Sequence, residues 1–219
     1  MTFRLPRWGL LLALWIPLPG CGALGEAMMQ TGTPSEVLDK PDLTGALPQV
    51  QLRMGLFAEE EVRQCEERFS AEEQPKGFSF GKTKVFDATL RIGNSIVTEA
   101  EANFRLVFPL VTDLAQFPPT AKDATEIDVV VVVGRPNLTL KQVEGRIYAA
   151  GLAVPFTVCS VSGTKVEETV ETASIRMSLS HSMWSNNNAG VRLGVRIAAQ
   201  QAVHQFLLKA PALMKKRFD

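Results

Sequence analysis

The sequence predicts an α+β domain with a mainly antiparallel sheet of about five strands, helices packed on one face and a long carboxy-terminal helix. Residues 126–133 include five consecutive valines, which is typical of a strand buried on both faces. Residues 165–179 alternate apolar and polar side chains, as expected of a sheet strand with one wet face. Residues 189–209 repeat apolar side chains at helical spacing. Together these patterns indicate strands and helices packed in layers.

The chain begins with the pattern of a secretory signal peptide. Arg4 and Arg7 form a basic start without acidic residues, and residues 9–16 are almost purely apolar. A basic region, a short apolar run and a small-residue cleavage site are the parts of such a signal. The apolar run is much shorter than the ~20 residues of a membrane-spanning helix. Residues 1–20 are therefore expected to be a cleaved signal peptide.

The segment Leu18-Pro19-Gly20-Cys21 resembles the lipobox of bacterial lipoprotein precursors. This resemblance implies cleavage before Cys21 and acylation of Cys21 (palmitate or related chains), which would hold the protein to a lipid bilayer. The alternative is an ordinary signal peptide with a chance cysteine near its cleavage point. Gly22, where lipoproteins retained at the inner membrane carry aspartate, implies the outer membrane of a bacterial cell envelope, with the domain in the periplasm.

Residues 21–48 are predicted to be a lipidated flexible tether, because they contain several glycines and prolines and few large apolar side chains. A flexible chain of this length spans ~30 Å root-mean-square. Residues 49–219 then form a single periplasmic α+β domain.

The composition limits the partners of the mature protein. Removing residues 1–20 from the 219 leaves 199 residues with 21 basic and 23 acidic side chains, a net charge near −2. This balance argues against nucleic acid as a partner, because binding to phosphates requires an excess of positive charge.

Three cysteines are present, an odd number for an oxidising compartment. If Cys21 carries lipid, Cys65 and Cys159 remain. They either form a disulfide, which in the chain-entropy model would stabilise the fold by ~4–5 kcal/mol, or are two buried thiols that never meet.

The first half of the domain is predicted to contain two strands and two helices. Residues 50–57 begin with the alternation of a strand. Residues 58–69 and 86–104 carry apolar side chains three and four positions apart, as in amphipathic helices. Gly93 lies within the second of these runs and is expected to kink or split it. Residues 106–111 form a short strand.

The second half is predicted to consist of strands followed by the final helix. Residues 144–160 are rich in residues that favour strands, and residues 161–164 have the composition of a hairpin turn into residues 165–179. The final helix carries an apolar stripe of Val195, Ala199, Ala202, Phe206 and Ala210. Pro211 is expected to end or bend it.

This order of elements is similar to that of small YajG-like envelope lipoproteins and of the amino-terminal domain of TolB. The resemblance covers roughly residues 50–210. It is carried by a strand ending Gly55-Leu56-Phe57, a central strand and an alanine-rich final helix. This resemblance does not identify any catalytic residue in the sequence.

Few residues in the sequence suggest catalysis, metal binding or ligand binding. Residues 77–83 have only three residues between their glycines, not the four of a phosphate-binding loop, so a turn before a helix is favoured. His181 and His204 lack metal-ligand spacing and are interpreted as surface histidines, so no metal and no cofactor is expected. Glutamates between residues 59 and 73 are interpreted as a solvated helix face. Trp184, in a polar loop, is either a partner contact or a lid over the core.

These observations favour a non-enzymatic, membrane-anchored lipoprotein acting as a binding or scaffolding module in envelope assembly or transport. Its expected partners are the lipid bilayer, through acylated Cys21, and an envelope protein. The alternative is a carrier that holds a small hydrophobic ligand or lipid between sheet and helices. A hydrolase is disfavoured, because no nucleophile–base pair is legible in the sequence.

Overall fold

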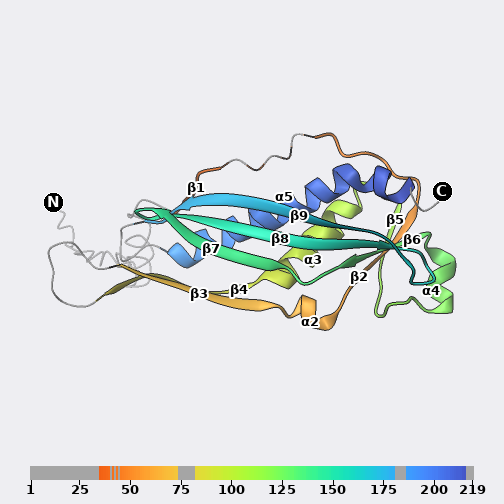
Figure 1. The fold of residues 1–219 in the computed structure, drawn as a ribbon, viewed down its shortest axis with the longest axis horizontal. Coiled ribbons are helices and arrows are strands. Elements are labelled where there is room, and N and C mark those ends of the chain that lie inside the picture. The colour runs from red at the N-terminus through yellow and green to blue at the C-terminus, as the bar shows by residue number, and fades with distance from the viewer. Residues whose placement is uncertain are drawn as a thin grey trace, which may run out of the picture.

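The computed structural model describes residues 35–39, 41, 43, 45–73, 82–180 and 186–215. This part of the chain is elongated, with the last helix running along the sheet (Figure 1). In chain order the elements are β1 (Glu36–Val37), β2 (Arg53–Ala58), α2 (Glu60–Arg63), β3 (Glu66–Glu73), β4 (Thr83–Arg91), α3 (Ile92–Phe104), β5 (Leu110–Asp113), α4 (Ala121–Glu126), β6 (Val129–Val133), β7 (Asn137–Glu144), β8 (Ile147–Cys159), β9 (Lys165–Ser178) and α5 (Asn187–Lys215).

The main sheet is mixed, so the prediction of a mainly antiparallel sheet of about five strands was wrong. Seven strands take part, in the order β1-β9-β8-β6-β2-β5, and β7 pairs with β8 beside β6. β2 lies between two parallel neighbours, β5 and β6, whereas β8 is antiparallel to β6, β7 and β9. The cause is the connection between strands: α3 and α4 lie on the crossovers that bring β5 and β6 back in the direction of β2. The predicted valine strand and the predicted 161–164 hairpin are confirmed.

A separate two-stranded sheet of β3 and β4 replaces much of what was predicted as helix. The spacing of Val62, Cys65 and Phe69 fits a helix, but α2 ends after Arg63, and β3 then alternates exposed and half-buried residues. The same period of two holds in β4, where Phe86, Ala88 and Leu90 are buried. Gly93 is the second residue of α3, so the run predicted as one helix divides before this glycine, between Arg91 and Ile92.

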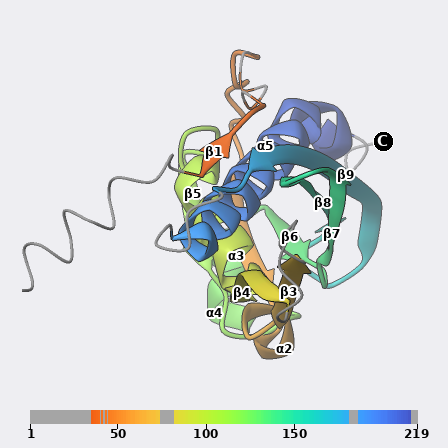
Figure 2. The same ribbon diagram turned by 90° about the vertical axis from the view of Figure 1, so that its left-hand side faces the viewer.

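The core lies between one face of the curled sheet and the helices α3 and α5, as Figure 2 shows. Phe206 of α5 stacks on Phe156 of β8, at 4.5 Å between ring centroids, and on Phe104 of α3, at 5.6 Å, and the rings of Phe104 and Phe156 are 6.5 Å apart, so the three form one cluster. The predicted α5 stripe, from Val195 to Ala210, is buried along its length. The placement of these two helices on one face of the sheet therefore confirms that part of the predicted fold.

The helix α5 continues through Pro211 to Lys215, so of the two predicted effects of this proline, ending the helix near Lys209 was wrong. No helix among the described residues is long and apolar enough to cross a membrane.

Part of the predicted tether lies against the domain. Glu36 and Val37 add an edge strand to β9. Asp39 then accepts hydrogen bonds from the backbone N–H of Arg176, at 2.7 Å, and from its guanidinium, at 2.8–3.3 Å. The docked segment therefore starts well before residue 49.

Asn187, the first residue of α5, joins several segments at one end of the sheet. Its side-chain amide donates to the carbonyl oxygens of Val85, at 2.9 Å, and Ser180, at 3.2 Å. Its oxygen accepts from the backbone N–H of Ser180, at 2.9 Å, and from the hydroxyl of Ser35, at 2.7 Å. Because Asn187 is buried, these bonds satisfy polar atoms that water cannot reach.

The pairing of Asp39 with Arg176 predicts a pH dependence. The hydrogen bond from Arg176 lowers the pKa of Asp39 below its ordinary value. A carboxyl whose pKa is lower in the folded state stabilises the fold above its unfolded pKa of about 3.9, and this stabilisation is lost as pH falls. We therefore expect Asp39→Asn to lower the free energy of unfolding more at pH 7 than at pH 3 in urea titrations. Equal effects at the two pH values would contradict this role for Asp39.

Candidate functional site

The residues predicted to act at the membrane or with a partner, Cys21 and Trp184, lie outside the described residues, as does His181. Residues 77–81 of the glycine-containing segment lie outside them too. Thr83, at the end of that segment, begins a strand and not the expected helix.

The two remaining cysteines are free and buried in this structure, which matches the second alternative from the sequence. Cys65 follows α2, where its carbonyl accepts from the N–H of Gly93. Cys159 ends β8 and packs in a small apolar cluster with Leu114, Ile127 and Val130. Burial raises the pKa of the Cys159 thiol, which favours its protonated, unreactive form.

His204 is buried, so its interpretation as a surface histidine was wrong. It lies on α5 one turn from Gln201. The Nε2 atom of His204 and the Oε1 atom of Gln201 are buried and have no hydrogen-bond partner among the described residues. Nor does the described part of the chain hold any group of three or more His, Cys, Asp or Glu side chains that could bind a metal ion.

The most distinctive surface feature is a pocket of about 490 Å³ between β4, α3 and α5, which we call the arginine pocket. Three arginines and one glutamate line it together with two hydroxyl and two aliphatic residues: Arg91, Arg192, Arg196, Glu66, Thr89, Ser95, Leu90 and Val195. Its lining carries three positive charges and one negative charge, in a chain whose formal net charge is zero. The pocket therefore concentrates positive charge that the rest of the protein balances.

Three elements position these arginines. Arg192 and Arg196 are four residues apart on α5 and so project from the same face of the helix. Arg91 is the last residue of β4, and its carbonyl accepts a hydrogen bond from the Ser95 hydroxyl at 2.9 Å in the first turns of α3. The turn from β4 into α3 thus brings Arg91 to the arginines of α5.

Two of the arginines pair with carboxylates. The Nε atom of Arg91 lies 2.8 Å from Glu66, and the Nε atom of Arg196 donates to Glu99 at 2.9 Å. Among the described residues, Arg192 has no ion pair, and its side chain is exposed. The pocket therefore has capacity for an added negative charge.

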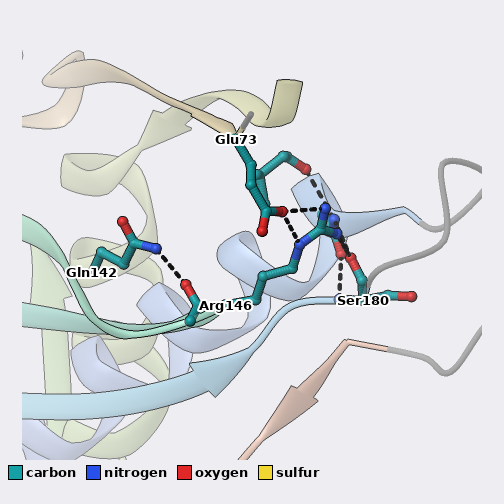
Figure 3. A network of polar contacts seen from close by, with 7 residues as sticks. Glu73, Gln142, Arg146 and Ser180 are labelled. Carbon is teal, nitrogen blue, oxygen red and sulfur yellow. Dashed lines mark hydrogen bonds and ion pairs between the residues drawn. The ribbon is translucent and has the colours of Figure 1, made fainter. Parts of the chain in front are cut away.

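A different arginine, Arg146, has a structural role instead. Figure 3 shows Arg146 between the end of β3 and the end of β9. Its Nε donates to Glu73 at 2.6 Å, and its Nη1 donates to the carbonyl of Ser180. Only 13% of the Arg146 side chain is exposed, and its guanidinium group connects Glu73 of β3 to the main sheet. In contrast, the three arginines of the arginine pocket are exposed to solvent.

Only part of this pocket could be predicted from the sequence. Arg192 and Arg196 have helical spacing, a pattern that could have been found. Arg91 and Glu66 lie about 100 residues or more from them along the chain, and only the fold brings the four together.

No protein-family model and no curated protein matches this chain. Among solved structures, it is similar to a Xanthomonas campestris protein of the DUF330 family, with a TM-score of 0.49 and 13% identity over 85% of this chain and 96% of that one. It is also similar to a minor lipoprotein from Acinetobacter baumannii, with a TM-score of 0.45 and 14% identity over 75% and 94% of the two chains. A third likeness, to lipoprotein B from Nitrosomonas europaea, has a TM-score of 0.42 and 10% identity over 81% and 94%. Two of these three structures are named as lipoproteins, and none as a YajG-like or TolB-like protein, so that finer resemblance stays a prediction.

Proposed function

We propose that this protein is a lipid-anchored, non-enzymatic binding module of the bacterial cell envelope, and that its arginine pocket is where a negatively charged partner binds. The observation that carries the proposal is the excess of positive charge in this pocket, with Arg192 left without an ion pair among the described residues. Guanidinium groups bind carboxylates and phosphates through paired hydrogen bonds, so such a pocket suits an anionic group.

The anchor proposed for this module is Cys21, in its lipobox-like context. Between Cys21 and the first described residue, Ser35, there are 13 residues. Even fully extended, this segment reaches at most ~50 Å, so the domain would stay close to the bilayer that holds it. A single acyl chain binds a membrane only marginally, whereas several chains on one cysteine give stable anchoring.

The packed core argues against the alternative of a carrier with a ligand between sheet and helices. The ring centroids of Phe156 and Phe206 are only 4.5 Å apart at that interface, and the ring of Phe104 packs against both of them. These side chains occupy the space that a hydrophobic ligand would need. The proposal therefore places binding on the surface.

The test is site-specific photo-crosslinking in the native membrane. A photoreactive residue in place of Thr89, which is exposed and lines the pocket, is expected to trap a partner. Arg192→Glu should reduce that adduct strongly, because it places a like charge in the path of an anionic partner. Arg105→Glu is the matched control, since Arg105 is exposed and lies outside the pocket.

The proposal fails if the Thr89 probe gives no adduct beyond that of a probe at position 105. It also fails if the adduct survives Arg192→Glu as well as it survives Arg105→Glu.

A further inference from the structure

The contacts of the arginine pocket leave a particular set of hydrogen-bond donors facing outward. Arg91 and Arg196 make their closest carboxylate contacts through Nε. Within the described residues, no hydrogen bond engages the terminal Nη atoms of either side chain, or any guanidinium nitrogen of Arg192. Each arginine therefore offers its terminal amino groups to a ligand.

The carboxylates that contact Nε hold these two guanidinium groups beside the pocket, while the arginine side chains stay 77% and 71% exposed. Glu99 is almost fully buried on α3, and Asn103 donates to its backbone carbonyl at 2.7 Å, so the partner of Arg196 is held on a rigid helix. Glu66 lies in β3, paired directly with Arg91 across the two-stranded sheet. An anion would thus meet terminal amino groups that solvent can reach, on side chains whose Nε atoms are already paired.

The number of arginines indicates which anionic group the pocket suits. Three arginines and Glu66 give the lining a net charge of +2, and Glu99, which pairs with Arg196, lowers the charge of the whole cluster to +1. A carboxylate or a phosphodiester offers only two charged acceptor oxygens to the three guanidinium groups. A phosphate monoester carries between −1.5 and −2 near neutral pH and has three strong acceptor oxygens, about one for each arginine.

The rest of the pocket fits the organic part of such a ligand. Leu90 and Val195 are buried aliphatic residues in its lining, and Thr89 and Ser95 add hydroxyl groups. The volume of about 490 Å³ lies within the range of small-molecule sites and leaves room beyond one phosphate group.

We propose that the arginine pocket binds a phosphate monoester, with Arg91, Arg192 and Arg196 holding the phosphate and Leu90 and Val195 contacting the group that bears it. This inference rests on the proposed function, because it names the ligand chemistry of the same site. The monoester is either a soluble phosphorylated molecule or the headgroup of a lipid, and binding to vesicles distinguishes the two sources.

The experiment is calorimetric titration of the full chain carrying Cys21→Ser, so that no acyl chain contributes to binding. The probes are glycerol 3-phosphate, a monoester, and dimethyl phosphate, a diester of fixed single charge. We expect glycerol 3-phosphate to bind at least about tenfold more tightly at pH 7.5, and Arg192→Gln to weaken it by about tenfold, since hydrogen bonds to charged groups have this magnitude. Arg105→Gln should change neither affinity.

The pH dependence gives a second readout. Between pH 5 and pH 7.5 a phosphate monoester gains its second negative charge, with a pKa of about 6, and its affinity should rise. The diester gains no charge over this pH range, so any change in its affinity between pH 5 and pH 7.5 comes from the protein. Equal affinities for the two probes, or parallel pH profiles, would overturn the proposal.

Vesicles distinguish the source of the monoester. Phosphatidylcholine vesicles containing phosphatidic acid should sediment the Cys21→Ser protein in an Arg192-dependent manner if the natural ligand is a lipid headgroup. Binding of glycerol 3-phosphate without such sedimentation supports a soluble ligand.

The two proposals can fail separately. If neither glycerol 3-phosphate nor phosphatidic acid binds while Arg192→Glu still abolishes the Thr89 adduct, the phosphate inference is wrong and the proposed binding module is still supported. If that adduct is unaffected as well, both are wrong.

Discussion

Replacing Phe206 by alanine is expected to lower the free energy of unfolding by about 3–5 kcal/mol. Phe206 is completely buried and stacks on Phe104 and Phe156, so it joins α5 to both α3 and β8. Its removal loses the burial of a large aromatic side chain and leaves a cavity between elements that cannot collapse fully. Urea unfolding of the purified protein, followed by circular dichroism, measures the change.

Leu193→Ala is the matched control, because Leu193 lies on the same helix with 48% of its surface exposed. We expect it to change the free energy of unfolding by no more than about 0.5 kcal/mol. Similar losses for the two variants would show that α5 is not held to the sheet through the phenylalanine stack.

Replacing Gly93 by alanine is expected to cost about 3 kcal/mol, at the upper end of the usual range for overpacking. A Cβ atom at this position would lie 1.7 Å from the carbonyl oxygen of Val62 and 2.8 Å from its carbonyl carbon. These are backbone atoms of α2, and the Gly93 N–H also donates to the Cys65 carbonyl beside them. The clash can be relieved only by moving α2 away from α3.

The same urea titration tests this prediction, with Asn94→Ala as its control. Asn94 is the next residue of α3 and is exposed, and alanine is the better helix former. We therefore expect Asn94→Ala to be neutral or slightly stabilising. A Gly93→Ala protein as stable as the wild type would contradict the close approach of α2 and α3.

The elements that the sequence predicts well are those whose local pattern matches their final burial. The five valines of β6 are buried or nearly so, as their uninterrupted apolar run implies. β9 alternates as predicted, and α5 buries its predicted stripe. In each case the period of the apolar residues is the period of the element, so no information from distant residues is needed.

The elements that the sequence predicts poorly depend on partners that are distant along the chain. Val62, Cys65 and Phe69 satisfy a helical spacing by coincidence, while the pairing of β3 with β4 decides the outcome. The parallel neighbours of β2 lie more than 50 residues away along the chain, so their direction could not be seen locally. The same holds for the arginine pocket, where Arg91 meets Arg192 only because the β4–α3 turn packs beside α5.

The most direct test of the central claim, that the module is anchored by lipid, is the intact mass of the natural protein extracted from membranes. The account predicts a chain that begins at Cys21, heavier than its sequence mass by a diacylglyceryl group and one further acyl chain. A chain that retains residues 1–20, or one that begins at an unmodified residue, would contradict it.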